Sequence, residues 1–234
     1  MSFMESIDPI LRQPKQKRSR ETLSRILGAA ETCIREEGFD SLRMAEIARR
    51  AGCSVGTLYS RLPDKMALLR AVQNKVHDCI EPPFLAEMTI ERESGGSLEE
   101  AAERVFTLLC RHFLSERELF SAFMMRGVFD PGLRQGGENA NLVRRQAVAA
   151  ALLPHRAQIG QPDPELALDM AYTTCLAVIR GRLIWGAADE IRGPFTDEVL
   201  VGELARVLIA YLRGDAGVPA VMADAACQSV TESL

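Results

Sequence analysis

Hydrophobic residues recur at helical spacing along almost the whole chain. The first stripe, within residues 22–37, consists of Leu23, Ile26, Leu27, Ala30, Cys33 and Ile34. Spacings of three and four residues put these side chains on one face of a helix, and Gly38 is typical of the position just beyond a helix end. The stripes that follow predict three more helices, at 44–50, at 54–62, and from Asp64 to Pro82 and Pro83.

The second half of the chain continues this pattern. Ser97-x-x-Glu100 and Ser115-x-x-Glu118 have the spacing of capping boxes, which open helices. The expected helices are 97–114, 115–129, 139–157, 164–188 and 196–213, with residues 130–139 as a loop. No strand pattern is present, so the sequence predicts an all-α protein of about nine helices.

Composition narrows the class of protein. Of the 234 residues, 47% are hydrophobic and 26% are charged, which is typical of a soluble globular chain. No apolar run approaches the roughly 18 residues that span a bilayer, and the first 20 residues lack the apolar region of a signal peptide. Six scattered cysteines without a C-x-x-C motif are consistent with reduced thiols. We therefore expect a cytoplasmic location.

Charge is distributed unevenly. Residues 1–80 carry a net charge of +4 and the remainder −8, and five of the cations lie between Arg12 and Arg20 with no anion among them. A small basic part on an acidic body is typical of a nucleic-acid-binding module fused to another domain. The alternative for the basic run alone is a solvated tail.

Gly52 to Gly56 match G-x-S-x-G, the nucleophile elbow of serine hydrolases. An elbow serine needs a buried strand before it, but "MAEIARRA" precedes Gly52 and is helical in pattern. The three histidines all lie in or at the end of predicted helices. No G-x-G-x-x-G, Walker loop or metal-ligand spacing is present. We therefore expect no enzyme activity, no cofactor and no metal, and interpret Ser54 as a helix cap.

The same stretch favours a helix-turn-helix. Two short helices joined by a tight turn at Gly52-Cys53 would leave the second free to enter the major groove of DNA. Its outer face would present hydroxyl, aromatic and guanidinium groups that suit phosphates and base edges. These are Val55, Thr57, Tyr59, Ser60 and Arg61, while Ile47, Ala48, Leu58 and Leu62 would pack inward.

Residues 18 to about 70 resemble the DNA-binding domain of the TetR family of bacterial transcriptional regulators. The resemblance rests on "GFDSLRMAEIARRAGCSVGTLYSRLPDKMALL". It implies a homodimer that binds palindromic operator DNA. The DNA contacts that it and the basic arm imply are Lys17, Arg18, Arg43, Ala45, Ser54, Val55, Gly56, Thr57, Tyr59, Ser60, Arg61 and Lys65. Arg43 and Met44 replace the usual small hydroxyl cap of the second helix, and we expect Ser41 to cap it instead.

The expected domains are a basic arm (1–18), a helix-turn-helix domain (19–66), a helical ligand-binding and dimerisation domain (67–214) and a loose tail (215–234). By the resemblance, the last two helices would form a four-helix interface with a second copy. The candidate interface residues are Trp185, Leu200, Leu204, Val207, Leu208 and Tyr211. These stripes could equally belong to the core of one protomer.

Aromatic and sulfur-containing side chains suit an adaptable apolar pocket. The candidate pocket residues are Phe106, Cys110, Phe113, Phe120, Phe123, Met124, Tyr172 and Cys175. The polar candidates that would orient an effector are His112, Arg126, Tyr172 and Thr173. Because few buried charges are expected, the effector is expected to be largely hydrophobic. The alternative is that the aromatic residues are plain core.

The sequence therefore favours a ligand-responsive transcriptional regulator, with repression as the expected role. An activator, or a regulator of the same fold without a ligand, is the first alternative. A helical adaptor protein and a hydrolase that uses the G-x-S-x-G motif are the others.

Overall fold

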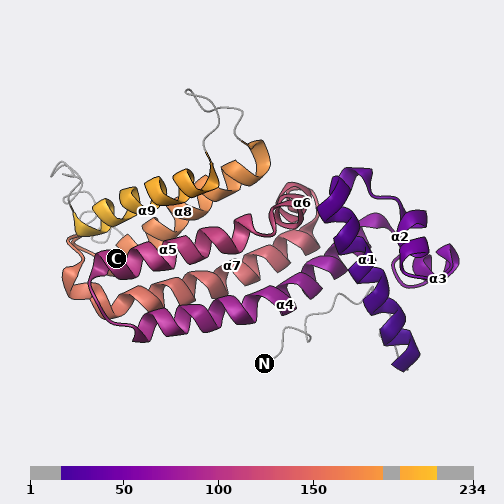
Figure 1. Cartoon of the computed structure of the whole chain (residues 1–234), viewed down its shortest axis with the longest axis horizontal. Coiled ribbons are helices and arrows are strands. Elements are labelled where there is room, and N and C mark those ends of the chain that lie inside the picture. Colours follow the sequence, from indigo (N-terminus) through magenta and orange to yellow (C-terminus); the bar gives the residue numbers. More distant parts are fainter. Residues whose placement is uncertain (1–16, 187–195, 215–234) are drawn as a thin grey trace, which may run out of the picture.

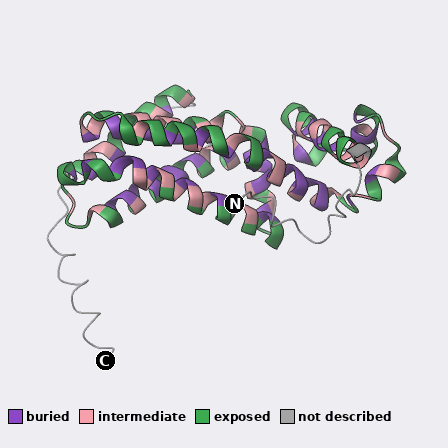
Figure 2. Cartoon of the chain, turned by 90° about the horizontal axis from the view of Figure 1, so that it is seen from below, coloured by how far each residue is buried: buried purple, intermediate pink, exposed green. Residues whose placement is uncertain are grey.

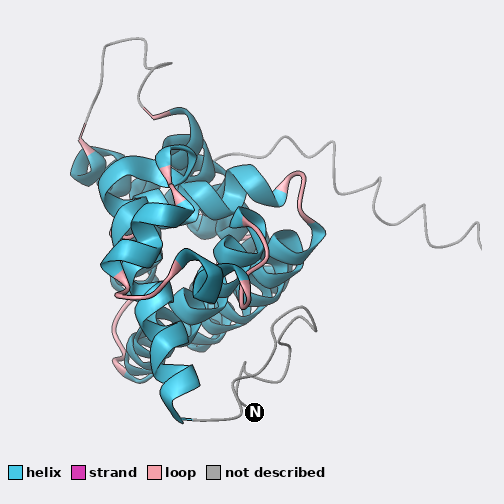
Figure 3. Cartoon of the chain, turned by 90° about the vertical axis from the view of Figure 1, so that its right-hand side faces the viewer, coloured by secondary structure: helices cyan, strands magenta, loops and turns pink. Residues whose placement is uncertain are grey.

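The computed structural model of the chain describes residues 17–186 and 196–214. All regular structure in these ranges is helical, which confirms the expected all-α class (Figure 3). The elements are α1 (Lys17–Ser41), α2 (Met44–Arg50), α3 (Val55–Tyr59), α4 (Lys65–Glu93), α5 (Leu98–Leu114), α6 (Arg117–Gly127), α7 (Pro131–Leu152), the 3₁₀ helix η2 (Leu153–Gln158), α8 (Pro164–Trp185) and α9 (Asp197–Arg213). The first three helices form a cluster at one end of an elongated bundle (Figure 1).

Helix α4 connects the end cluster to the bundle and runs along one side of it (Figure 1). The prediction that it ends at Pro82 and Pro83 is wrong, because the helix continues through both prolines to Glu93. Each proline removes a hydrogen bond to the carbonyl four residues earlier. Those carbonyls belong to Asp78 and Cys79, which are exposed, so water can satisfy them. The buried face of the helix packs against the bundle on both sides of the prolines.

Helix α7 begins where a loop was expected. Asp130 accepts a hydrogen bond from the Leu133 backbone N–H at 2.9 Å, and Pro131 occupies the first helical position. This combination of cap and proline starts a helix that runs through the glycines of "GLRQGG". The prediction of a loop at 130–139 is therefore wrong. Glycines favour loops, but in this segment the packing of α7 against α4 keeps the backbone helical.

Of three other expected helix caps, one is confirmed and two are wrong. The capping box at Ser97 and Glu100 is confirmed, with both reciprocal hydrogen bonds at 3.2 Å. Ser115 instead ends α5, and Glu116 precedes α6 without a side-chain cap. The N-cap position of α2 is Arg43, which makes no capping hydrogen bond, so the expectation that Ser41 caps this helix is wrong.

Buried residues form one stripe on most helices, with exposed residues on the opposite side (Figure 2). The hydrophobic core is continuous from the end cluster through the bundle. Helix α9 packs on α5 and α8, and it ends where the Gly160 N–H donates to the Leu212 carbonyl at 2.9 Å. None of the helices in the described ranges is long and apolar enough to cross a membrane.

Candidate DNA-binding and effector sites

The turn between α2 and α3 has the geometry of a helix-turn-helix. Gly52 adopts φ 63°, a left-handed conformation that glycine takes without strain. The Ser54 hydroxyl oxygen then accepts the Thr57 backbone N–H at 3.1 Å, capping α3. Ser54 and Thr57 hydroxyls also lie 2.9 Å apart. Ser54 is thus occupied as a helix cap, in a helical setting without the strand that an elbow serine needs.

The inward face of this motif is fully buried, as expected. Ile47, Leu58 and Leu62 are each 0% exposed and pack with α1. The opposite face of α3 is open, with Val55 42% and Tyr59 47% exposed. The other exposed candidates are Arg43, Ala45, Ser54, Gly56 and Ser60, and Thr57 is partly buried. The candidate DNA contacts of α3 therefore share one accessible surface.

Two cationic candidates, Lys65 and Arg61, are partly buried, whereas most other candidate DNA contacts are exposed. The Lys65 ammonium donates to the Asp40 carbonyl at 3.0 Å and lies 4.6 Å from the centre of the Phe39 ring, and burial lowers its pKa. Arg61 is half-buried beyond the end of α3, with its Nε buried and without a hydrogen bond. The side chains of Lys17 and Arg18 lie outside the described part of the structure.

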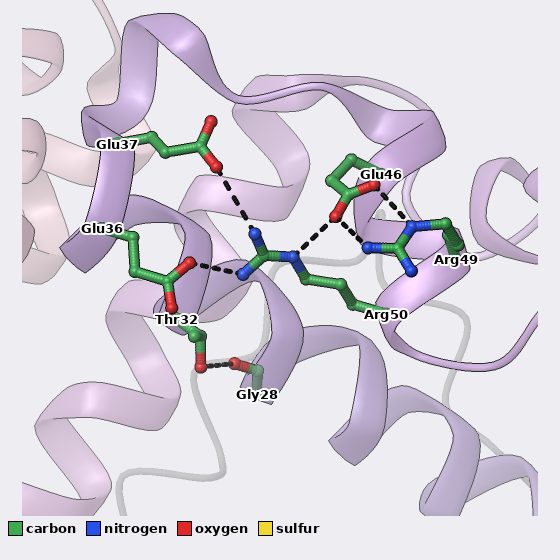
Figure 4. A network of polar contacts seen from close by, with 7 residues as sticks. All are labelled: Gly28, Thr32, Glu36, Glu37, Glu46, Arg49 and Arg50. Carbon is green, nitrogen blue, oxygen red and sulfur yellow. Dashed lines mark hydrogen bonds and ion pairs between the residues drawn. The ribbon is translucent and has the colours of Figure 1, made fainter.

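The remaining arginines of α2 are engaged by carboxylates (Figure 4). Arg49 makes two hydrogen bonds to Glu46, at 2.8 and 2.6 Å. Arg50 reaches Glu46 at 2.7 Å, Glu36 at 2.5 Å and Glu37 at 3.4 Å, which ties α2 to the end of α1. Residues 19–66 contain eight cations and seven anions, so this domain is close to neutral.

A pocket of about 390 Å³ lies in the bundle, which is within the usual range for small-molecule sites. Helices α4, α5, α6, α7 and α8 all contribute to its wall. The candidates Phe113, Phe120, Phe123 and Met124 line it. The other candidates do not line it: Phe106, Cys110, Tyr172 and Cys175 are buried in the core, where the thiols of Cys110 and Cys175 lie 3.7 Å apart.

The polar lining differs from the one expected. None of His112, Arg126, Tyr172 and Thr173 lines the pocket. The polar residues that do are Gln73, His77, Arg134, Glu138, Asn141, Arg144 and Arg180. A helical stripe of apolar residues gives no signal for them, because Gln73, His77 and Arg144 are single polar side chains among core positions and the exposed ones look like ordinary surface residues.

Behind the pocket lies a buried ion pair. Glu81 on α4 and Arg144 on α7 are each 3% exposed, and the Arg144 Nε lies 3.1 and 3.0 Å from the two Glu81 oxygens. His112 Nε2 lies 3.4 Å from the same carboxylate. Burial opposes ionisation of Glu81, but His112 and the Arg144 guanidinium outweigh it and hold its pKa at about 2. The premise that few charges are buried is therefore wrong.

The pocket and the helix-turn-helix domain are joined by helices that contact both of them. Helix α4 starts beside α1 and supplies Gln73 and His77 to the pocket wall. The Gln73 amide donates to the Leu133 carbonyl of α7 at 3.1 Å. Next to the pocket residue Gly127, the Arg126 guanidinium of α6 forms an ion pair with Asp40 at the end of α1. Helices α4 and α6, which line the pocket, therefore also contact α1 of the helix-turn-helix domain.

The candidate dimerisation residues fall into two groups. Leu200, Leu204 and Leu208 are buried within the protomer, and Tyr211 packs partly against the same core. Trp185 is 70% and Val207 60% exposed. Other exposed apolar residues lie on the same two helices: Leu166, Met170 and Val178 on α8, and Val199 on α9. Gly181 and Gly202 have open space where a side chain would stand.

Residues 26–72 match the family model described as bacterial regulatory proteins, tetR family. Uncharacterized HTH-type transcriptional regulators of Mycobacterium tuberculosis and Mycobacterium bovis are 44% identical to the chain over 52 residues. The match spans 22% of this chain and only 28% of each relative's length.

Solved structures resemble most of the chain. NalD of Pseudomonas aeruginosa, the secondary repressor of a multidrug efflux pump, is 21% identical with a TM-score of 0.56, over 84% of this chain and 98% of NalD. A Saccharomonospora viridis protein described as a transcriptional regulator, in complex with choline, is 19% identical with a TM-score of 0.62, over 85% and 97% of the two chains. These identities support a shared fold.

The family match covers the same residues that form α1 to the first turns of α4, including the capped α3 and the turn at Gly52. Residues 26–72 are therefore identified as a helix-turn-helix domain of the bacterial tetR family, and the bundle that follows shares its fold with solved TetR-family structures.

Proposed function

We propose that this regulator is a repressor that binds palindromic operator DNA as a homodimer and releases it when a small organic effector enters the bundle pocket. The observation that carries the proposal is the continuity of α4. One helix packs beside the recognition motif at its start and lines the pocket at Gln73 and His77.

In this mechanism α3 enters the major groove with its open face. Tyr59, Thr57 and Ser60 offer hydroxyl groups to phosphates and base edges, and Arg43 supplies an exposed cation at the start of α2. Arg61 can contact a guanine once its guanidinium turns outward. Lys65 is proposed to hold α1 to α4 through Asp40 as well as to contact a phosphate.

Dimerisation would use the outer faces of α8 and α9. These faces expose Trp185, Met170 and Val207, and such apolar patches mark interaction surfaces. A two-fold dimer places two recognition helices on one face of the duplex, with half-sites about 34 Å apart. The effector would shift the population toward a pose in which this spacing no longer matches. By reciprocity, operator DNA must weaken effector binding by the same factor.

The proposal is tested by fluorescence anisotropy with duplex DNA from the region upstream of the chain's own gene. We expect a salt-dependent complex with two protomers per site. Tyr59→Ala removes an exposed side chain, so it should weaken specific binding about tenfold without unfolding the protein. The matched control is Arg92→Gln, which removes an exposed cation at the far end of α4.

If the intact dimer binds no upstream duplex at low salt, the proposal is wrong. A reporter strain separates repression from activation, because deletion of a repressor raises expression of the regulated gene and deletion of an activator lowers it. Since DNA binding requires access to the chromosome, the proposal also implies a cytoplasmic protein.

A further inference from the structure

The polar groups of the bundle pocket have an excess of positive charge. Three guanidiniums line it, those of Arg134, Arg144 and Arg180, against the single carboxylate of Glu138. Glu81 neutralises part of this charge from behind Arg144. Hydrogen-bond donors therefore outnumber acceptors on the pocket wall.

The buried member of this set has unused donors. Arg144 is 3% exposed and directs Nε and Nη2 to Glu81, while its Nη1 makes no hydrogen bond to a described residue. Beside it, His77 is 4% exposed and lines the pocket without a hydrogen bond to any described residue. Neither Arg144 Nη1 nor a ring nitrogen of His77 is among the fully buried polar atoms without a partner, so these atoms face the pocket space. A ligand that displaces water from them without accepting a hydrogen bond would leave them unpaired, at a cost of about 1–3 kcal/mol, more for a charged donor. These two side chains thus favour a ligand with hydrogen-bond acceptors.

The exposed members stand at the rim of the same pocket. The side chains of Arg134 and Arg180 form no ion pair or hydrogen bond with described residues, and both residues are exposed. Burial raises the pKa of Tyr172 to about 12, while the positive charges of Arg144 and Arg180 oppose this rise. Both guanidiniums therefore act on one phenol, whose hydroxyl donates to the Asn141 side-chain oxygen at 2.8 Å. The buried and the exposed cation therefore both line the pocket and both lie within electrostatic range of this one side chain.

The rest of the wall is apolar. Phe113, Phe120 and Phe123 come from α5 and α6, and Leu133, Leu176 and Ile184 come from α7 and α8. A ligand that fills this space must bury a hydrocarbon body. Its polar end would then meet Arg144, His77 and Arg180.

From these features we propose that the effector is an amphipathic organic anion, with a hydrocarbon body against the phenylalanines and a carboxylate or similar head between Arg144 and Arg180. The inference rests on the proposed function, since it names the ligand class of the same pocket. The head would accept hydrogen bonds from Arg144 Nη1 and from the Arg180 guanidinium, which are strong because both partners are charged.

Two other ligand classes fit the pocket less well. A quaternary ammonium needs open aromatic faces, but the Arg144 guanidinium lies 4.9 Å from the Phe113 centroid and 5.5 Å from that of Phe120. A second cation there would also meet like charge. A wholly apolar molecule would leave Arg144 and His77 desolvated without a partner, which is unfavourable.

The test uses three probes that share one body and differ in the head: decanoate, decanamide and decyltrimethylammonium. Their affinity for the full-length protein is measured by isothermal titration calorimetry without DNA. Decanoate should bind at least tenfold more tightly than either of the others. Arg180→Gln should reduce decanoate affinity about tenfold and leave decanamide affinity within twofold, whereas the control Arg92→Gln should change neither. Because Arg180 is exposed, its replacement should leave the fold intact.

The proposal is overturned if decanamide or decyltrimethylammonium binds as tightly as decanoate. It is equally overturned if Arg180→Gln leaves the preference unchanged, or if no probe binds at millimolar concentration. These outcomes do not affect operator binding, which is measured separately by anisotropy. If decanoate binds as expected but releases no operator, the ligand class stands and the proposed ligand-controlled repression fails.

Discussion

The buried pair of Glu81 and Arg144 makes a strong prediction about stability. Each side chain is 3% exposed, and removal of one partner leaves the other charge buried and uncompensated. Such a loss costs about 3–5 kcal/mol, whereas replacement of both partners by apolar residues of similar volume is often neutral or stabilising. Glu81→Leu or Arg144→Met should therefore destabilise the protein severely. The double variant should regain stability to within about 1 kcal/mol of the natural chain.

For a chain of this size, each kcal/mol corresponds to about 2–4 °C in melting temperature, so the single variants should melt about 6 to 20 °C lower. Thermal unfolding is followed by circular dichroism at one fixed protein concentration, because the proposed dimerisation would make the transition concentration-dependent. The control pair is Arg213 and Glu99, 3.0 Å apart with side chains 47% and 40% exposed. Breaking an exposed pair of this kind should cost less than about 1 kcal/mol.

The reasoning is refuted if Glu81→Leu costs no more than the exposed control, or if the double variant is as unstable as the worse single variant.

Lowering the pH should also remove the stabilising contribution of Glu81. The pKa of Glu81 is held at about 2, below its ordinary value of 4.5. Its contribution is therefore present above about pH 4.5 and is lost as pH falls toward 2. Glu81→Gln should remove this part of the acid sensitivity.

Three other changes test separate parts of the structure. Burial lowers the pKa of His77 from 6.5 to about 4, so the folded state loses roughly 3 kcal/mol as pH falls through that interval, and His77→Leu should flatten the urea midpoints over it. Ser54→Ala removes the cap of α3 and should cost about 1 kcal/mol in urea unfolding, with equal and negligible ester hydrolysis by both proteins. Gly160→Ala would bring a methyl group 2.1 Å from the Arg213 carbonyl oxygen, so the melting temperature should fall by several degrees; an unchanged value would contradict this contact.

Local signals in the sequence were sufficient to predict the helix-turn-helix. The turn at Gly52, the cap at Ser54 and the inward position of Leu58 each depend on residues within a few positions of one another. Such features follow from backbone geometry and helical periodicity alone. The motif could therefore be identified, with its buried and exposed faces, before any tertiary contact was known.

The bundle was harder to predict because its decisive contacts join distant residues. Glu81 and Arg144 are 63 positions apart, and neither sits in a motif. Periodicity indicates that Leu200 and Leu204 share a face, but it cannot tell whether that face meets the same protomer or another one. Pro82 is a helix breaker in sequence, yet packing on both sides of it keeps α4 continuous.

The carboxylates that hold Arg49 and Arg50 have a consequence for how the protein searches the genome. Non-specific affinity for DNA comes almost wholly from cations that replace condensed counterions. Because these two arginines are engaged by Glu46, Glu36 and Glu37, they should contribute less to such binding than unpaired cations would. The non-specific affinity of this domain should then depend on its other cations, such as Arg43, and on the five cations between Arg12 and Arg20.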